Sequence, residues 1–283
     1  MQIVPAGAAL TVRSWVRLER LWSRDTPLPS TAGWLRALEP AFSAIGLLRP
    51  VRVTVEPGVS LKLDPADDVA RTILVSRGGH WEPEVWAAIS EPLKPGAVFI
   101  DVGAHIGYDT LKAARLVGDT GKVVAFEPNP TTLVDLTANV QASGATNVEI
   151  QPVALTDREQ QLTLFDARRT GNSGSSSLSA KNAGDDGTPY TVRGRALDDV
   201  VIELKLRRVD VIKADVEGAE MLVLSGAKGT LIQYHPRLIL EIVPRQLENM
   251  GTSVRELEDL IRSLGYNRDR WIDYKNKEYT LVR

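Results

Sequence analysis

The sequence predicts an α/β fold, in which a mostly parallel, Rossmann-like sheet carries helices on both faces and follows an N-terminal appendage. Strand and helix patterns alternate from Ala97 to Val153, as they do in consecutive βαβ units. The first of these strands leads into a glycine loop that reopens as a helix. The tail from Asn267 to Val282 is typical of a strand hairpin, which indicates a mixed sheet whose last strand runs against the rest.

The expected elements follow one another in a regular order. Residues 1–90 are expected to form the appendage, with helices in the first fifty residues, a hairpin at 51–63 around Pro57-Gly58, and short helices at 67–76 and 82–90. Residues 91–283 are expected to form the main domain. Its strands are predicted at 97–101, 122–127, 148–153, 210–215 and 237–243, followed by the tail hairpin with its turn around Asn276. Its helices are predicted at 107–117, 130–143, 218–225 and 254–264.

One segment interrupts the alternation. Residues 166–189 are rich in Gly, Ser and Asn and contain almost no large apolar side chains. Such a segment is either a mobile loop over a binding site or a solvated connection. If it is a loop over the site, its backbone amides should become protected from exchange when a ligand binds.

Composition argues against several classes of function. The formal net charge of -2 gives no global electrostatic reason to bind nucleic acid. The absence of cysteine excludes disulfides, a cysteine nucleophile and thiolate zinc sites, and it fits a cytoplasmic location. No apolar run approaches the ~20 residues of a membrane span. We therefore expect no nucleic-acid partner and no transmembrane segment.

The glycine loop and the acids at two strand ends indicate the kind of ligand. The loop reads G-x-x-x-G from Gly103 to Gly107, whereas the dinucleotide fingerprint G-x-G-x-x-G requires glycine where His105 stands. Asp101 and Glu127 end successive strands, and ligands bind beyond the carboxyl ends of strands in open α/β sheets. A carboxylate beside the loop is unfavourable next to a pyrophosphate. It suits S-adenosylmethionine (SAM), which carries an ammonium, a sulfonium and a ribose diol but no phosphate.

Four segments resemble the successive motifs of the FkbM family of SAM-dependent class I methyltransferases. They are VFIDVGAHIG, VVAFEPNP, VDVIKADVEGAEMLVLSGA and PRLILEI. The resemblance covers about residue 92 to the C-terminus, and its most specific part runs from Lys213 to Glu220. It implies a seven-stranded sheet with a reversed last strand, and methyl transfer to a hydroxyl of a specialised metabolite or a sugar. His105 departs from the pattern, because relatives commonly carry Asn there.

The resemblance also implies cofactor contacts. The glycine loop would line the methionine part of SAM, Glu127 would accept hydrogen bonds from the ribose hydroxyls, and Ala154 would lie near the adenine. The residues assigned to the cofactor are Asp101, Gly103, His105, Gly107, Glu127, Pro128, Asn129, Ala154 and Asp215.

Methyl transfer to a hydroxyl needs an aligned acceptor and a group that takes up the proton, but no enzyme nucleophile. The candidate catalytic residues are Asp215 and Glu217, at the tip of the 210–215 strand, and His105 in the glycine loop. Two neighbouring carboxylates raise one another's pKa, which suits a general base. We expect no metal site, unless Asp215 and Glu217 hold a divalent ion between them.

Other acids in this part of the chain allow two interpretations. Glu217 and Glu220 also suit the N-terminus of a helix, where the helix dipole favours negative charge. Glu241 ends an apolar strand and, if buried, needs a partner. It is either an acceptor-binding residue or the partner of Arg245 or Lys213 in an ion pair.

The leading hypothesis is a SAM-dependent O-methyltransferase that acts on a small molecule. An NAD-dependent oxidoreductase would explain the fold and Glu127, but not Asp101 or His105. A non-catalytic binding protein on a degenerate methyltransferase fold is the third hypothesis, and the intact motif acids argue against it. The tryptophan-bearing N-terminal helices are candidates for a contact between two copies of the chain.

Overall fold

The computed structural model describes residues 49–76, 79–184 and 186–281. Contacts divide the chain into two units, residues 1–81 and residues 82–283. The expected N-terminal helices, and the contact between copies that we expected of them, fall in the first 48 residues and so lie outside the described residues. Within the described ranges, no helix is long and apolar enough to cross a membrane.

The described part of the first unit is a hairpin and a helix, as predicted. Strands β1 (Val51–Glu56) and β2 (Val59–Leu63) pair antiparallel. Helix α3 (Asp68–Val75) begins after Asp67, whose side chain accepts a hydrogen bond from the N–H of Ala70 and so caps the helix. The inward-facing strand positions are apolar and buried, which explains the alternation in the sequence.

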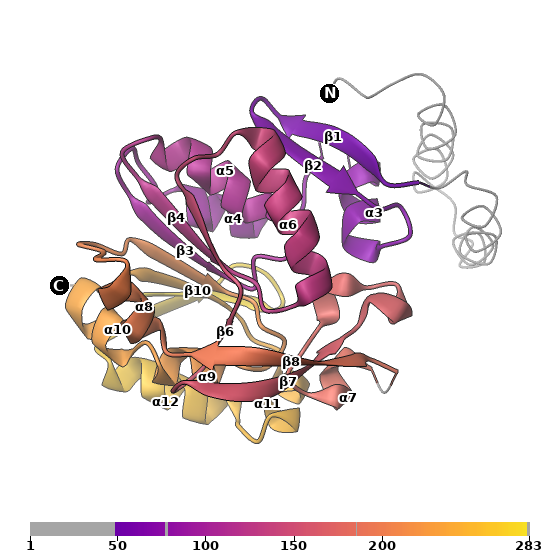
Figure 1. Ribbon diagram of the computed structural model, residues 1–283. Helices are drawn as coiled ribbons and strands as arrows, with labels where there is room; N and C mark the ends of the chain where they lie inside the picture. Colours follow the sequence, from indigo (N-terminus) through magenta and orange to yellow (C-terminus); the bar gives the residue numbers. More distant parts are fainter. Residues whose placement is uncertain (1–48, 77–78, 185, 282–283) are drawn as a thin grey trace. The chain divides into compact units, whose positions relative to one another are not determined.

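The larger unit is built on a seven-stranded sheet with the order β11-β12-β10-β9-β3-β4-β5 (Figure 1). Strands β10, β9, β3, β4 and β5 are parallel, whereas β12 is antiparallel to both of its neighbours. The predicted mixed sheet with a reversed last strand is therefore confirmed. The tail turn lies at 272–275, just before Asn276. The strands are β3 (Val98–Val102), β4 (Lys122–Phe126), β5 (Val148–Gln151), β9 (Val211–Ala214), β10 (Arg237–Glu241), β11 (Arg268–Trp271) and β12 (Asn276–Thr280).

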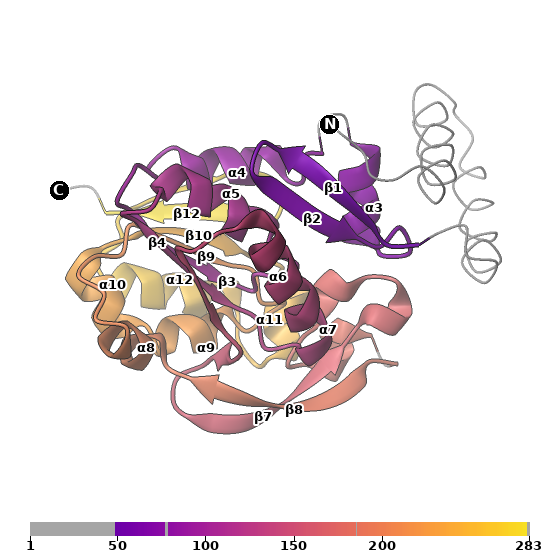
Figure 2. The ribbon, with the colours of Figure 1, turned by 45° about the horizontal axis from the view of Figure 1, so that its top comes forward.

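Helices cover both faces of this sheet (Figures 1 and 2). Helices α4 (Pro83–Ser90) and α5 (Tyr108–Val117) pack against Phe99 and its neighbours on one face. Ile100, the next residue along β3, belongs to the core on the other face, because successive strand residues point to opposite sides. The helices of that second face are α8 (Leu197–Glu203), α9 (Glu220–Ser225), α10 (Lys228–Tyr234), α11 (Pro244–Asn249) and α12 (Val254–Ser263).

The strand order creates a switch point between β3 and β9. The chain adds β4 and β5 on one side of β3 and later places β9 and β10 on its other side. The connections after β3 and β9 therefore lead away from one another, which leaves room for a ligand at the carboxyl ends of these strands. Helix α6 (Pro130–Ser143) follows β4 on the β5 side of this point, with the bounds expected from the sequence.

A small three-stranded sheet follows β5, and the sequence analysis did not predict it. Its order is β6-β8-β7, with β6 (Ala154–Leu155), β7 (Gln160–Asp166) and β8 (Thr188–Arg195). Between β7 and β8, the chain forms two short 3₁₀ turns and helix α7 (Ala180–Ala183). Polar and charged side chains occupy most positions of β7 and β8, so their apolar pattern is weak.

Candidate functional site

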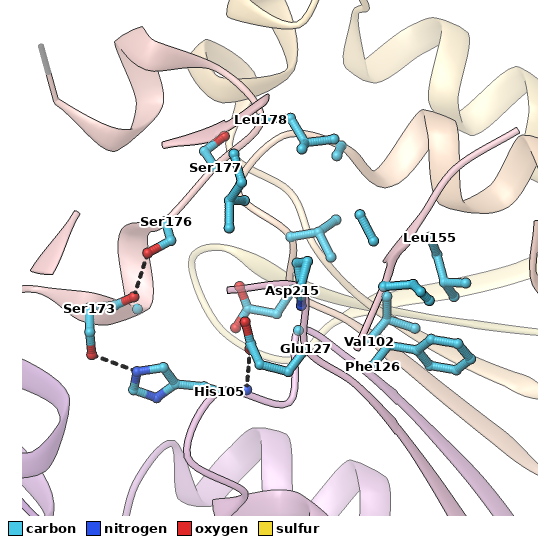
Figure 3. A pocket seen from close by; sticks show the side chains of 18 residues that line it. Val102, His105, Phe126, Glu127, Leu155, Ser173, Ser176, Ser177, Leu178 and Asp215 are labelled. Atoms are coloured by element: carbon cyan, nitrogen blue, oxygen red, sulfur yellow. Dashed lines mark hydrogen bonds between the residues drawn. The ribbon is translucent and has the colours of Figure 1, made fainter. Parts of the chain in front are cut away.

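A cavity lies at the carboxyl ends of β3, β4 and β9, at the switch point of the sheet (Figure 3). Besides these strand ends, β6 and the 166–189 segment contribute to its walls. Asp101, Gly107 and Asn129 were also predicted to bind the cofactor but are not among the lining residues. The predicted residues that do line it are Gly103, His105, Glu127, Pro128, Ala154 and Asp215.

The cavity is small in this structure. Its volume of about 60 Å³ is well below the ~300 Å³ at which pockets for larger organic ligands begin. Ser173, Gly174, Ser176, Ser177 and Leu178 of the 166–189 segment form part of its wall. The segment therefore lies over the site rather than in solvent, and a ligand of SAM size requires the wall to move.

Glu127 is held in place at the end of β4 by two backbone donors. Its Oε2 accepts a hydrogen bond of 2.8 Å from the N–H of His105, and its Oε1 accepts one of 2.8 Å from the N–H of Asn129. Burial raises the pKa of Glu127 to about 7, although both backbone donors oppose this shift. Each oxygen keeps a second lone pair, so the carboxylate can still accept hydrogen bonds from a ligand.

The glycine loop needs its glycines for close packing. Gly103 has φ 81°, and a Cβ there would lie 2.0 Å from the carbonyl oxygen of Asp215, which follows β9. Gly107 has φ 90°, and a Cβ there would lie 2.7 Å from Cδ1 of Leu136 in α6. Glycine thus lets the loop approach β9 on one side and α6 on the other.

Asp101 and Asn129 do not line the cavity, but their hydrogen bonds stabilise the elements around it. Asp101 is 1% exposed, and its Oδ2 accepts a hydrogen bond of 2.5 Å from the hydroxyl of Thr110, while its Oδ1 has no hydrogen-bond partner among the described residues. Burial raises the pKa of Asp101, against the effect of nearby Lys213. Asn129 caps α6 by accepting a hydrogen bond of 3.0 Å from the N–H of Thr131.

Hydrogen bonds attach the 166–189 segment to both sides of the cavity. Nε2 of His105 lies 2.6 Å from Oγ of Ser173, as Figure 3 shows. On the same side, the amide of Asn129 donates to the hydroxyl of Ser176 at 3.1 Å. On the other side, the hydroxyl of Ser177 and the amide of Asn182 both donate to the carbonyl oxygen of Glu217, each at 2.8 Å. His105 thus contacts this segment in the present structure.

A second wall of the cavity includes Asp215, which belongs to a cluster of acids that we call the acidic group: Asp215, Glu217 and Glu241. Each offers a carboxylate oxygen, and these oxygens lie within 4.8 Å of one another. Glu217, a predicted catalytic residue, and Glu241 are not among the residues that line the cavity. Asp215 and Glu217 belong to the turn between β9 and α9, and Glu241 is the last residue of β10. Glu241 pairs with Lys275 at 2.5 Å, so neither Arg245 nor Lys213, the two partners considered from the sequence, makes this ion pair.

Burial and mutual repulsion shift the pKa values of this group. Burial and the charge of Asp215 raise the pKa of Glu217 to about 8 and that of Glu241 to about 9. Asp215 is half-buried, and Lys213 and Lys275 hold its pKa below its ordinary value. The nearest of these, Lys213, lies 3.4 Å from Asp215 and 3.6 Å from Asp109.

Glu220 belongs to the helix start rather than to the acidic group. It is 1% exposed, and its Oε1 accepts hydrogen bonds from the N–H groups of Gly218 and Val216 at 3.3 and 3.4 Å. These donors precede α9, so the interpretation of Glu220 as a helix N-terminal acid is confirmed. Glu217 accepts a hydrogen bond from the side chain of Gln246 in α11 instead.

Several residues around the site were not predicted from the sequence. Lys275 pairs with Glu82 as well as Glu241, and these three residues come from distant parts of the larger unit. Gln246 contacts Glu217 from a helix that was not predicted. No local pattern could have indicated these contacts. The run of serines in the 166–189 segment was a usable signal, since short side chains with hydroxyls can hold a loop against a site by hydrogen bonds.

Comparisons with known proteins agree with the topology and the motifs. A model of the methyltransferase FkbM domain matches residues 101–268, more than half of the chain. The AMB antimetabolite synthetase AmbE of Pseudomonas aeruginosa is 30% identical over 215 residues, which are 65% of this chain and 10% of that protein. The 2-O-methyltransferase NoeI of Sinorhizobium fredii is 29% identical over 182 residues, 60% of this chain and 73% of that protein.

A similar solved structure is that of an FkbM methyltransferase from Methylobacillus flagellatus KT, with a TM-score of 0.45 and 16% sequence identity. The match covers 86% of this chain and 59% of that one. The chain thus spans a tenth of the synthetase and under two thirds of the crystallised methyltransferase. On the strength of the domain match, which includes the glycine loop, both strand-end acids and the turn after β9, the chain belongs to the FkbM family of methyltransferases.

Proposed function

We propose that this chain transfers the methyl group of SAM to a hydroxyl oxygen of a small molecule. The observation that carries the proposal is the set of charges around the cavity. Among the described residues that line it, the acids are Glu127 and Asp215, and there is no lysine or arginine. Such a site suits a cationic ligand with hydroxyl donors and is unsuited to a pyrophosphate.

The cofactor half of the site supports this assignment. The carboxylate of Glu127 is fixed by two backbone N–H groups and retains lone pairs for the two ribose hydroxyls. Ala154 and Leu155 add an apolar surface on the side where the adenine would lie. Asp215 faces the same cavity as a carboxylate, where it would favour the positive charge of SAM.

The acceptor half is assigned to the acidic group. In the transfer, the acceptor oxygen forms a bond to the methyl carbon, the bond from that carbon to sulfur breaks with its electrons going to sulfur, and the hydroxyl proton leaves. Glu217 is our candidate for taking up this proton, because it lies beside Asp215, which lines the cavity. Bonded to Ser173, His105 is the weaker candidate.

Oxygen as the methyl acceptor is supported by the likeness to NoeI, which is a 2-O-methyltransferase. A hydroxyl proton is also the kind that a carboxylate at a cavity wall can accept. An NAD-dependent oxidoreductase is disfavoured, because no cationic side chain among the described lining residues is available for its phosphates.

Calorimetry with S-adenosylhomocysteine (SAH), the product of SAM, tests the proposal. We expect saturable binding with one SAH per chain and no comparable binding of NADH. A transfer assay with methyl-labelled SAM on sugars and hydroxylated metabolites then tests the reaction. Folded protein that binds NADH but neither SAM nor SAH would overturn the proposal. Binding of SAH without transfer to any acceptor would favour the non-catalytic alternative.

A further inference from the structure

The nearby lysines do not balance the negative charge of the acidic group. Lys275 is shared by Glu82 and Glu241, at 2.9 and 2.5 Å. Lys213 is shared by Asp109 and Asp215, at 3.6 and 3.4 Å. Glu217 has no lysine or arginine within ion-pair distance in the described part of the chain. Two lysines thus face five carboxylates: Glu82, Asp109, Asp215, Glu217 and Glu241.

One carboxylate oxygen of the group is buried without a partner. Glu241 is 4% exposed, and its Oε1 accepts a hydrogen bond from Nζ of Lys275. Its Oε2 has no hydrogen-bond partner among the described residues. A buried carboxylate oxygen left unsatisfied is costly, so its position calls for a ligand or a proton. Because Glu241 belongs to the three acids whose oxygens converge, such a ligand would contact Asp215 and Glu217 too.

We propose that Asp215, Glu217 and Glu241 form a binding site for a divalent cation. The three ligands are all carboxylate oxygens, which hard cations such as Mg²⁺, Mn²⁺ and Ca²⁺ prefer over softer metals. The separation of up to 4.8 Å between the ligand atoms allows one ion to contact all three, since oxygens on opposite sides of an ion lie ~4 to 5 Å apart at the usual bond lengths.

The competing explanation is a proton shared within the group. Glu241 is close enough to Asp215 to donate a hydrogen bond to it when protonated. A shared proton satisfies one oxygen and one charge, whereas a divalent cation satisfies the orphan oxygen of Glu241 and adds two positive charges. A bound cation would also hold Glu217 ionised and would lower the pKa of an acceptor hydroxyl that contacts it, so that the proton leaves more readily; this consequence alone rests on the proposed function.

The test is cation binding, which does not depend on methyl transfer. Full-length protein treated with chelator is titrated with MgCl₂ and CaCl₂ by calorimetry and with MnCl₂ by electron paramagnetic resonance. We expect one saturable site per chain, at least tenfold weaker in Asp215→Asn and in Glu241→Gln. The matched control is Glu248→Gln, an exposed acid in α11 outside the group, which should bind as the wild type does.

Two results would overturn the proposal: no saturable binding in the millimolar range, or equal binding in the wild type and both variants. Melting curves recorded without cation show whether the variants are folded. Glu241→Gln relieves the repulsion between Glu241 and the other acids of the group, so it should melt at no lower temperature than the wild type. SAH titrations of the wild type and of Glu241→Gln measure the cofactor site independently, because Glu241 does not line the cavity. Wild-type protein that binds SAH normally but shows no saturable cation binding would therefore refute the cation site and leave the proposed function standing.

Discussion

The two acidic walls of the cavity are built in opposite ways. Glu127 is surrounded by donors, since the N–H groups of His105 and Asn129 each bind one of its oxygens. The acidic group is surrounded by other carboxylates, and its counter-charges are two lysines shared with further acids. Backbone N–H donors stabilise the charged form of a carboxylate, which can then accept hydrogen bonds from neutral hydroxyls. Carboxylates that lie close together repel one another, and a bound proton or cation relieves that repulsion. The comparison explains why we assign the cofactor to one wall and the acceptor to the other.

The largest effect should come from Gly103, where the glycine loop packs against the turn after β9. In Gly103→Ala, the new Cβ would meet the carbonyl oxygen of Asp215 at 2.0 Å, at a backbone φ of 81°. Strain and overpacking should lower the free energy of unfolding by about 2 to 5 kcal/mol. Chemical denaturation measures this loss. Gly144→Ala is the control, since its φ is 64° but nothing lies within 4 Å, so it should lose only about 1 to 2 kcal/mol.

An equal loss in both variants would show that φ alone matters and that the glycine loop does not press against the turn after β9. The proposed link between the two walls would then fail.

Removing the carboxylate of the first wall should break cofactor binding. Glu127→Ala should weaken SAH binding by about 2 to 3 kcal/mol, or roughly 30- to 150-fold, because hydrogen bonds to both ribose hydroxyls are lost. Calorimetry measures the change. Glu149→Ala on β5, where Lys122 is the partner, removes an acid at the neighbouring strand and should leave SAH affinity unchanged. Unchanged SAH affinity in Glu127→Ala would show that the ribose does not bind to Glu127.

The pH dependence of SAH binding should follow Glu127. Burial raises its pKa to about 7 in the free protein, so the carboxyl gains a proton as the pH falls through 7. A protonated carboxyl has lost its charge and one acceptor, so affinity should fall, by up to about tenfold for each pH unit below 7. Titrations between pH 6 and pH 8 should show this slope in the wild type and a flat profile in Glu127→Gln. Identical slopes would assign the effect to another group.

The smallest effect concerns the 166–189 segment that lies across the site. Ser173→Ala removes the contact with His105 and should speed amide exchange in this segment by an amount that corresponds to about 0.5 to 1.5 kcal/mol. SAH should protect the same amides in the wild type, because the segment must move to admit the ligand and then pack against it. Ser263→Ala, which removes a hydrogen bond in α12, is the control and should not affect the segment. Exchange unchanged by SAH would contradict the closing motion.

The main sheet could be predicted because its signal is local. Its strands are buried on both faces and therefore read as apolar runs, and each acid at a strand tip marks the edge where ligands bind. The positions of Glu127 and Asp215 at one cavity followed from that logic. The sheet of β6, β7 and β8 was missed because it is half solvated, and α11 was missed because it is a short helix with a single buried residue, Leu247.

The electrostatics of the second wall could not be predicted from the sequence. Lys275 lies in the tail hairpin and Glu82 precedes α4, yet Lys275 pairs with both Glu82 and Glu241, the last residue of β10. Such contacts depend on the strand order and not on spacing along the chain. Asp215 and Glu217 were predicted as a pair from the sequence, and the strand order adds Glu241 as the third member of the group.

The most direct test of the account is a crystal structure of the protein with SAH. We predict that both ribose hydroxyls lie within hydrogen-bond distance of the carboxylate of Glu127, and that the sulfur faces the wall formed by Asp215. The 166–189 segment should then stand further from the glycine loop than in the structure described here. SAH bound away from Glu127, or with its ribose directed to another residue, would contradict the account.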